Sequence, residues 1–160
     1  MKKIFSMILA TAMLIASVSM LSACGGEKAD VNGEKADVKI GFIFLHDENS
    51  TYDKNFLDAA EAATSELGLA PEQVIFKTNI PEGNECYEAA ADLADQGCDI
   101  VFANSFGHEP YMLKAAKEFP EVQFCHATGT TAHTENVANF HNAFASIYEG
   151  RYLAGIAVGM

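Results

Sequence analysis

The sequence predicts an α/β protein in which a doubly wound parallel sheet carries helices on both faces. Three observations favour this class. From residue 38 onward, short apolar runs alternate strictly with helical segments. The apolar runs are nearly continuous, as in strands that are covered on both faces. Strand–helix–strand repeats of this kind form right-handed crossovers, and therefore parallel sheets.

The pattern of residues 1–23 predicts an export signal. Lys2 and Lys3 precede an apolar stretch over residues 4–20, and Leu21-Ser22-Ala23-Cys24 is a lipobox, in which small residues precede a cysteine that accepts a diacylglyceryl group. We expect lipidation of Cys24, which gives stable membrane attachment without a spanning helix. A plain transmembrane anchor is the alternative, because the apolar stretch is nearly long enough to span a bilayer.

Residues 24–37 predict a polar tether. The sequence Gly26-Glu27-Lys28-Ala29-Asp30-Val31 recurs as Gly33-Glu34-Lys35-Ala36-Asp37-Val38, and two such copies do not make a solenoid. Their composition suits a flexible, extended connection between the lipid and the folded part.

The first strand is expected over Val38–Leu45, a continuous apolar run. A helix is expected over Thr51–Leu67, with Gly68 as its stop. Its predicted buried stripe consists of Phe56, Ala59, Ala60, Ala63 and Leu67.

The later elements follow the same alternation. We expect strands over 73–78, 99–103 and 122–127, a helix over 84–96 that ends at Gly97, and a third helix that Pro110 opens and Pro120 closes. Residues 128–135 are expected to form a polar loop, 137–140 a short strand, and 145–160 a helix. That last helix runs to residue 160 as an apolar, small-residue sequence without a polar stop, so we expect it to need partner elements beyond residue 160.

Composition narrows the class of partner. The chain carries a formal charge of −12, and without residues 1–23 it has 8 basic and 22 acidic side chains, a net −14. Such a surface repels phosphate backbones and argues against DNA or RNA as a partner.

Cys86, Cys98 and Cys125 fall in or beside apolar elements and are expected to be buried thiols.

Ligands of doubly wound sheets bind beyond the carboxyl ends of the strands. This rule selects four loops, which are rich in Asn, Ser, Thr and His: His46–Thr51, Asn79–Gly83, Asn104–Glu109 and Thr128–Glu135.

Several segments between Val38 and Met160 resemble one family. They are Lys39-Ile40-Gly41-Phe42-Ile43, Tyr52-Asp53-Lys54-Asn55-Phe56, Gly97 to Phe106, Phe119-Pro120-Glu121-Val122-Gln123-Phe124, and Tyr148 to Gly155. In this order, behind a lipobox, they resemble the basic membrane protein, or PnrA-like, substrate-binding lipoproteins of ABC transporters. The resemblance implies two α/β lobes of the type I periplasmic-binding-protein kind, with residues 38–128 as the first lobe and 129–160 as the crossover and the start of the second.

The resemblance also implies a ligand site. Family members with known ligands resemble nucleoside binders, and the aromatic ring that stacks on the base corresponds to Phe56. The alternative is that Phe56 heads the core stripe of its helix, and Asp53 caps that helix as readily as it holds a ribose hydroxyl. The predicted ligand-binding residues are Asn49, Tyr52, Asp53, Phe56, Asn104, Ser105, Phe106 and Thr128. Thr128 departs from the family, which usually has Ile-Asp-Gly where this chain has Ala127-Thr128-Gly129.

We therefore expect a lipid-anchored solute-binding protein, on the outer face of the cytoplasmic membrane or in the periplasm. It would pass a small, nucleoside-like ligand to an ABC permease with its ATPase, without a cofactor. No G-x-S-x-G, Walker A or H-E-x-x-H motif is present, so catalysis is not expected. A ligand sensor for a membrane receptor is one alternative. A metal-binding lipoprotein is another, because the chain has five histidines, although they lack zinc-site spacing.

Overall fold

The computed structural model describes residues 37–160. The predicted signal over residues 1–23, the lipidation site at Cys24 and all of the predicted tether except Asp37 lie outside the described residues.

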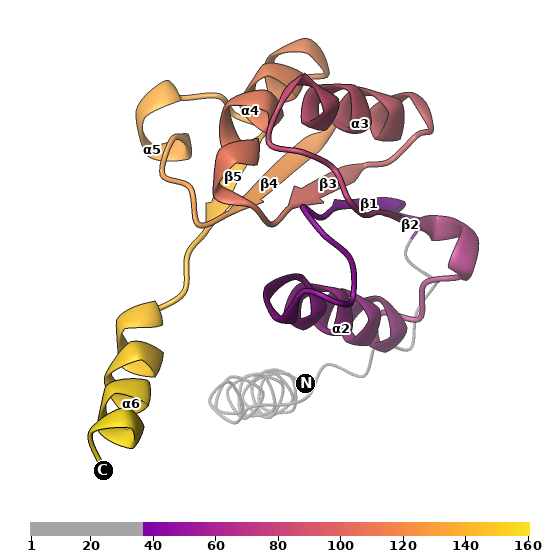
Figure 1. The fold of residues 1–160 in the computed structure, drawn as a ribbon. Helices are drawn as coiled ribbons and strands as arrows, with labels where there is room; N and C mark the ends of the chain where they lie inside the picture. The colour runs from indigo at the N-terminus through magenta and orange to yellow at the C-terminus, as the bar shows by residue number, and fades with distance from the viewer. Residues whose placement is uncertain (1–36) are drawn as a thin grey trace, which may run out of the picture. The chain divides into compact units, whose positions relative to one another are not determined.

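A five-stranded, entirely parallel sheet forms the centre of the fold, which confirms the predicted class (Figure 1). The strands are β1 (Ile40–Ile43), β2 (Val74–Lys77), β3 (Ile100–Ala103), β4 (Gln123–Ala127) and β5 (Phe140–Ala143). Their order in the sheet is β2-β1-β3-β4-β5. The chain moves outward from β1 to β2 and then crosses back to the other side of β1, so the loops after β1 and β3 separate at a topological switch point.

Helices cover the two faces of the sheet. They are α2 (Thr51–Glu66), α3 (Asn84–Asp95), α4 (Glu109–Glu118) and the short α5 (Ala132–Glu135), whereas α6 (Ile147–Gly159) projects away from the sheet and buries none of its residues. In Figure 1, α3 and α4 lie on one face and α2 on the other. The prolines act as predicted, since Pro110 lies in the first turn of α4 and the helix ends before Pro120.

The segment between β4 and α6 corrects two expectations. The predicted loop over residues 128–135 contains α5, which ends at Asn136 in a left-handed conformation. The strand expected over residues 137–140 instead covers Phe140–Ala143, in register with β4. Asn139 fixes this position, because its side-chain amide donates to the carbonyl oxygens of Ala116, Phe119 and Val122. The apolar pattern did not find β5 because its second and third residues are polar, which an outer strand of the sheet tolerates.

The larger core lies between the sheet and the α3–α4 layer. Cys86 and Cys98 are buried there as predicted, and burial raises the pKa of the Cys86 thiol to about 12. Cys125 is only partly buried.

The stripe predicted for α2 is right for Ala60, which is buried, and for Phe56, which is partly buried, and wrong for the other three residues. Ala59, Ala63 and Leu67 are exposed, and the buried residues of the helix are Asp53, Ala60 and Thr64. The helix is rotated so that the polar Asp53 and Thr64 face inward, and this is possible because both make hydrogen bonds there.

Among the described residues, no helix has the length and apolar character that a membrane span requires.

Close packing of α3 on β1 yields a testable prediction. A Cβ atom at Gly41 would lie 2.7 Å from Cδ1 of Leu93, so the side chain of Leu93, which is fully buried in the core, would have to shift. Gly41→Ala should therefore lower the free energy of unfolding by about 1–3 kcal/mol in urea titrations. Gly150→Ala is the matched control, because nothing lies within 4 Å of a Cβ at that position of α6. Equal stability of Gly41→Ala and the wild type would contradict the close packing.

Candidate ligand-binding site

A buried polar cluster joins the loops that follow β1 and β3 at the switch point. Oδ1 of Asp53 accepts hydrogen bonds from Nδ2 of Asn104 (2.7 Å) and from the backbone N–H of His46 (3.2 Å). Oδ2 accepts from the hydroxyl of Ser50 at 2.6 Å. Ser50 is also the N-cap of α2, and its side chain accepts from the N–H of Asp53. The first turn of α2 is thereby fixed against the end of β3.

The electrostatics of Asp53 follow from these contacts. Burial raises the pKa of its carboxyl, but hydrogen bonds from Asn104, Ser50 and His46 outweigh burial and hold the pKa below its ordinary value. Asp53 is therefore a carboxylate at neutral pH, with its acceptor positions used inside the protein.

Aromatic side chains extend from this cluster towards solvent. The hydroxyl of Tyr52 donates to the carbonyl oxygen of Asn104 at 2.9 Å. Burial, followed by the charge of Asp53, raises the pKa of Tyr52, so its hydroxyl keeps its proton. The Tyr52 and Phe56 rings are 5.0 Å apart, and Phe56 is 6.3 Å from Phe102 of β3. The three rings form a continuous apolar wall.

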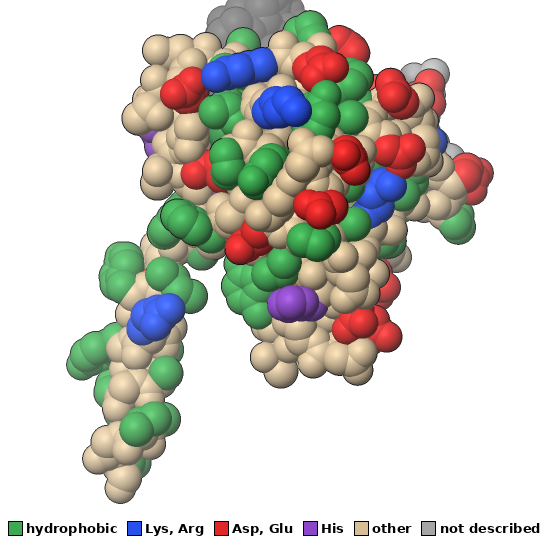
Figure 2. Space-filling model, turned by 45° about the horizontal axis from the view of Figure 1, so that its top comes forward, with side chains coloured by type: hydrophobic (Ala, Val, Ile, Leu, Met, Phe, Trp, Pro, Cys, Tyr) green, Lys and Arg blue, Asp and Glu red, His purple; other side chains and the backbone are tan. Residues whose placement is uncertain are grey.

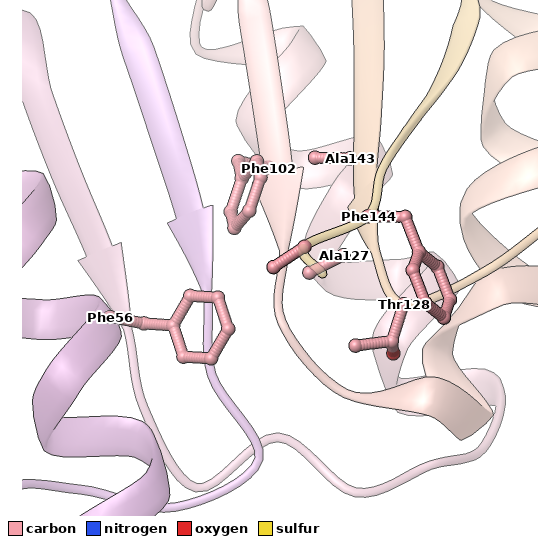
Figure 3. A pocket seen from close by; sticks show the side chains of 7 residues that line it. Phe56, Phe102, Ala127, Thr128, Ala143 and Phe144 are labelled. Carbon is pink, nitrogen blue, oxygen red and sulfur yellow. The ribbon is translucent and has the colours of Figure 1, made fainter. Parts of the chain in front are cut away.

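Two adjoining hollows lie beside this wall. The larger, of about 490 Å³, is lined by Tyr52, Asn55, Phe56, Thr128, Phe144, Ala145, Ile147 and Arg151. The smaller, of about 300 Å³, is lined by Phe56, Phe102, Ala127, Thr128, Ala143, Phe144 and Ala145. Figure 3 shows the smaller one, with Phe56 on one side and Thr128 and Phe144 on the other. Their combined size and aromatic lining suit a small, flat ligand.

Glu82 holds the loop after β3 in place. Its Oε1 accepts hydrogen bonds from the hydroxyl of Ser105 and from the N–H of Gly107, the latter at 2.8 Å. These bonds lower the pKa of Glu82. His126 supports the same loop from β4, because its Nε2 lies 2.6 Å from the carbonyl oxygen of Ser105.

A similar arrangement holds the loop after β4. Oε1 of Glu109 accepts from the N–H of Thr131 at 2.7 Å and from Nδ2 of Asn142 at 3.2 Å. Gly129 passes so close to this carboxylate that a Cβ there would clash with it. The preceding Thr128 has φ of +69°, which is unfavourable for a β-branched residue. Its N–H donates to the carbonyl oxygen of Ala143 at 3.0 Å, so pairing with the end of β5 maintains the strained conformation.

The structure brings together three of the predicted ligand-binding residues, Tyr52, Phe56 and Thr128, around the larger hollow. Three others are buried in the supporting contacts, since Asp53, Asn104 and Ser105 are 1%, 0% and 5% exposed. Asn49 is exposed and bonds to Asp47, and Phe106 is 71% exposed and lines neither hollow.

Of the residues that line the larger hollow, sequence reasoning missed five: Asn55, Phe144, Ala145, Ile147 and Arg151. Asn55 could have been found, because it precedes Phe56 in the first turns of the predicted helix. Phe144 directly follows β5, and the misplaced strand hid it. Within residues 37–160, no group of three or more His, Cys, Asp or Glu side chains is placed to hold a metal ion.

Comparisons with known proteins give a family and two similar sequences. A sequence model described as "ABC transporter substrate-binding protein PnrA-like" matches residues 43–160. The chain is 33% identical over 147 residues to a purine-binding protein of Brucella abortus, an alignment that covers 90% of this chain and 39% of that protein. Over 62 residues it is 40% identical to a Haloferax volcanii protein named as an ABC transporter glucose-binding protein, covering 39% of this chain and 15% of that protein.

A solved structure shares the fold. An ABC transporter solute-binding protein from Conexibacter woesei superposes with a TM-score of 0.57 at 21% identity, over 67% of this chain and 35% of that chain. This chain therefore spans well under half the length of these similar proteins.

The Asp53 cluster predicts a specific loss of stability. Asp53→Ala leaves the buried donors of Asn104, Ser50 and His46 without their acceptor, and should lower the free energy of unfolding by about 3 kcal/mol at pH 7 in urea titrations. Asp58→Ala, which removes only an exposed pair with Lys54, should change it by less than about 0.5 kcal/mol.

The same variant predicts a pH dependence. The pKa of Asp53 is lower in the folded than in the unfolded state, so its stabilisation is complete above the unfolded value of about 3.9 and is lost as pH falls through the folded value. The difference between wild type and Asp53→Ala should therefore shrink between about pH 5 and pH 2. A constant difference over that range would contradict the assignment.

Proposed function

The chain belongs to the PnrA-like family of ABC transporter substrate-binding proteins, and from that premise we propose that it captures a purine nucleoside in the hollow beside Phe56. One observation carries the proposal: Phe56 and Phe144 face a shared hollow beside the carboxyl ends of β4 and β5, the edge of the sheet at which doubly wound folds bind their ligands. A flat base between such rings gains stacking energy on its faces. The similarity to a purine-binding protein supports the same ligand class.

In this proposal, the residues divide into those that contact the ligand and those that position them. Tyr52, Phe56 and Phe144 provide apolar surface. The polar groups beside them are the Asn55 amide, which already donates one hydrogen bond to the carbonyl oxygen of Thr51, and the Thr128 hydroxyl, which also bonds to the side chain of Tyr52. Their remaining donor and acceptor positions can bond to the ligand. Asp53, Asn104 and Ser105 are buried, and their hydrogen bonds hold the loops in position.

The protein is proposed to work without catalysis, as the binding component of an importer. Two lobes close on the ligand by hinge motion, and the complex docks on a permease with its ATPase. We place the boundary between the two lobes after Ala143 rather than after residue 128, because β5 pairs with β4 and therefore belongs to the sheet of the first lobe. A lipid on Cys24 holds the protein at the outer face of the cytoplasmic membrane or in the periplasm.

Titration calorimetry of the full-length protein tests the ligand class. Adenosine, guanosine and inosine are the candidate ligands, and glucose is the alternative, because one relative carries that name. Heat from glucose and none from any purine nucleoside would remove the nucleoside proposal. Recovery of the ligand unchanged after long incubation would agree with a binding role.

Phe56→Ala should weaken nucleoside binding about 10-fold or more, since the stacking of one base on an aromatic ring contributes about 1–3 kcal/mol. Phe106→Ala is the matched control, because this exposed ring lines neither hollow, and its affinity should equal that of the wild type. Equal affinities of the Phe56→Ala variant and the wild type would assign the ring to the core, where it also packs.

The lipid anchor has its own test. Full-length protein expressed with a labelled fatty acid should incorporate the label and sediment with membranes, whereas Cys24→Ala should do neither. Cys125→Ala is the control, because that free thiol lies in β4 and should leave the labelling unchanged. Label retained by Cys24→Ala would refute lipidation at this residue.

A further inference from the structure

Arg151 is the only arginine of the chain, and it lines the larger hollow. It lies on α6 four residues after Ile147, so both side chains project from one face of the helix towards the hollow. The aromatic rings that face them in this hollow, those of Tyr52 and Phe56, come from the first turns of α2. Figure 2 shows that hydrophobic side chains gather on α6. Arg151 is the only basic residue of that helix.

Arg151 differs from the other basic side chains of the described residues in having no partner. The described lysines all interact within the protein: Lys39 with the carbonyl of Gln96, Lys54 with Asp58, Lys77 with Asp92, Lys117 with Glu135, and Lys114 with the ring of Tyr87. Arg151 has no hydrogen bond or ion pair with any residue from 37 to 160. No carboxylate lines the hollow either, so its guanidinium is the only charge there.

A guanidinium group in this position favours ligands that carry hydrogen-bond acceptors. It presents a planar, rigid set of donors and no acceptor, so it matches two neighbouring acceptors on one edge of a flat molecule. The O6 and N7 atoms of a 6-oxopurine form such a pair, whereas adenine offers N7 beside an amino donor. The other polar groups discriminate less, because the Asn55 amide and the Thr128 hydroxyl can each donate or accept.

A phosphate ligand fits this site poorly. The hollow contains a single cation among mostly apolar and aromatic residues, whereas bound phosphate usually meets several donors. The charge of Arg151 is therefore better matched to the edge of a base than to a dianion.

We propose that Arg151 makes this protein prefer 6-oxopurine nucleosides, such as guanosine and inosine, over adenosine by a bidentate hydrogen bond to O6 and N7. The inference rests on the proposed nucleoside function, and concerns which member of that class is bound.

Calorimetric titration of the full-length protein tests the preference directly. Wild type should bind guanosine and inosine at least about 10-fold more tightly than adenosine. Arg151→Gln, which removes the charge, should reduce this ratio below about 3-fold. Arg151→Lys, which keeps the charge but loses the paired donors, should reduce it as well. Lys54→Gln is the control, because it removes a nearby charge outside the hollow, and its ratio should equal that of the wild type.

A ligand lacking one acceptor isolates the contact. 7-Deazaguanosine has no N7 acceptor, so wild type should bind it about 10-fold more weakly than guanosine, while Arg151→Gln should bind the two equally. If wild type binds adenosine as tightly as guanosine, or if Arg151→Gln keeps the preference, the role of Arg151 is refuted and the nucleoside function stands. If no purine nucleoside binds, both fail.

Discussion

The hydrogen bond between Asp53 and Asn104 fixes the geometry on which the site depends. It joins the first turn of α2 to the end of β3, two segments about 50 residues apart in sequence. Asp53 is ionised and buried, and a buried carboxylate is stable only while its acceptors are satisfied. The chain must therefore bring Ser50, His46 and Asn104 to it together. Tyr52 and Phe56 are positioned as a consequence, because they flank Asp53 on the same helix.

The residues that hold the loops of the site differ from those that line its hollows. Glu82 and Glu109 each accept a hydrogen bond from one backbone N–H of a loop at the carboxyl edge of the sheet, that of Gly107 and that of Thr131 respectively. These carboxylates hold the loops, and neither of them lines the two hollows. The surface left for a ligand is consequently aromatic, with few polar groups and one cation. Such a surface selects by shape and by the few donors it has, which suits a small, flat, neutral molecule.

The sequence predicts most of this fold because buried parallel strands must be apolar on both faces, and that pattern survives in four of the five strands. It fails for β5, an outer strand with polar residues at His141 and Asn142, whose position depends on the amide of Asn139. It fails also for the inner face of α2, where hydrogen bonding rather than hydrophobicity buries Asp53. The site was predictable to the extent that its residues follow strands. Phe144 and Arg151 depend on where β5 ends and on how α6 lies, and neither is a local property of the sequence.

The backbone of Thr128 places a limit on which side chains this position accepts. A positive φ is easy for glycine, moderate for asparagine and aspartate, and costly for a β-branched residue, by roughly 1–3 kcal/mol. Aspartate, usual here in the family that the sequence resembles, tolerates this conformation better than threonine does. Compared with that aspartate, threonine places a hydroxyl instead of a negative charge beside the hollow, at the cost of a less favourable backbone conformation. The stability of the loop after β4 and the charge of the ligand site are therefore set by the same residue.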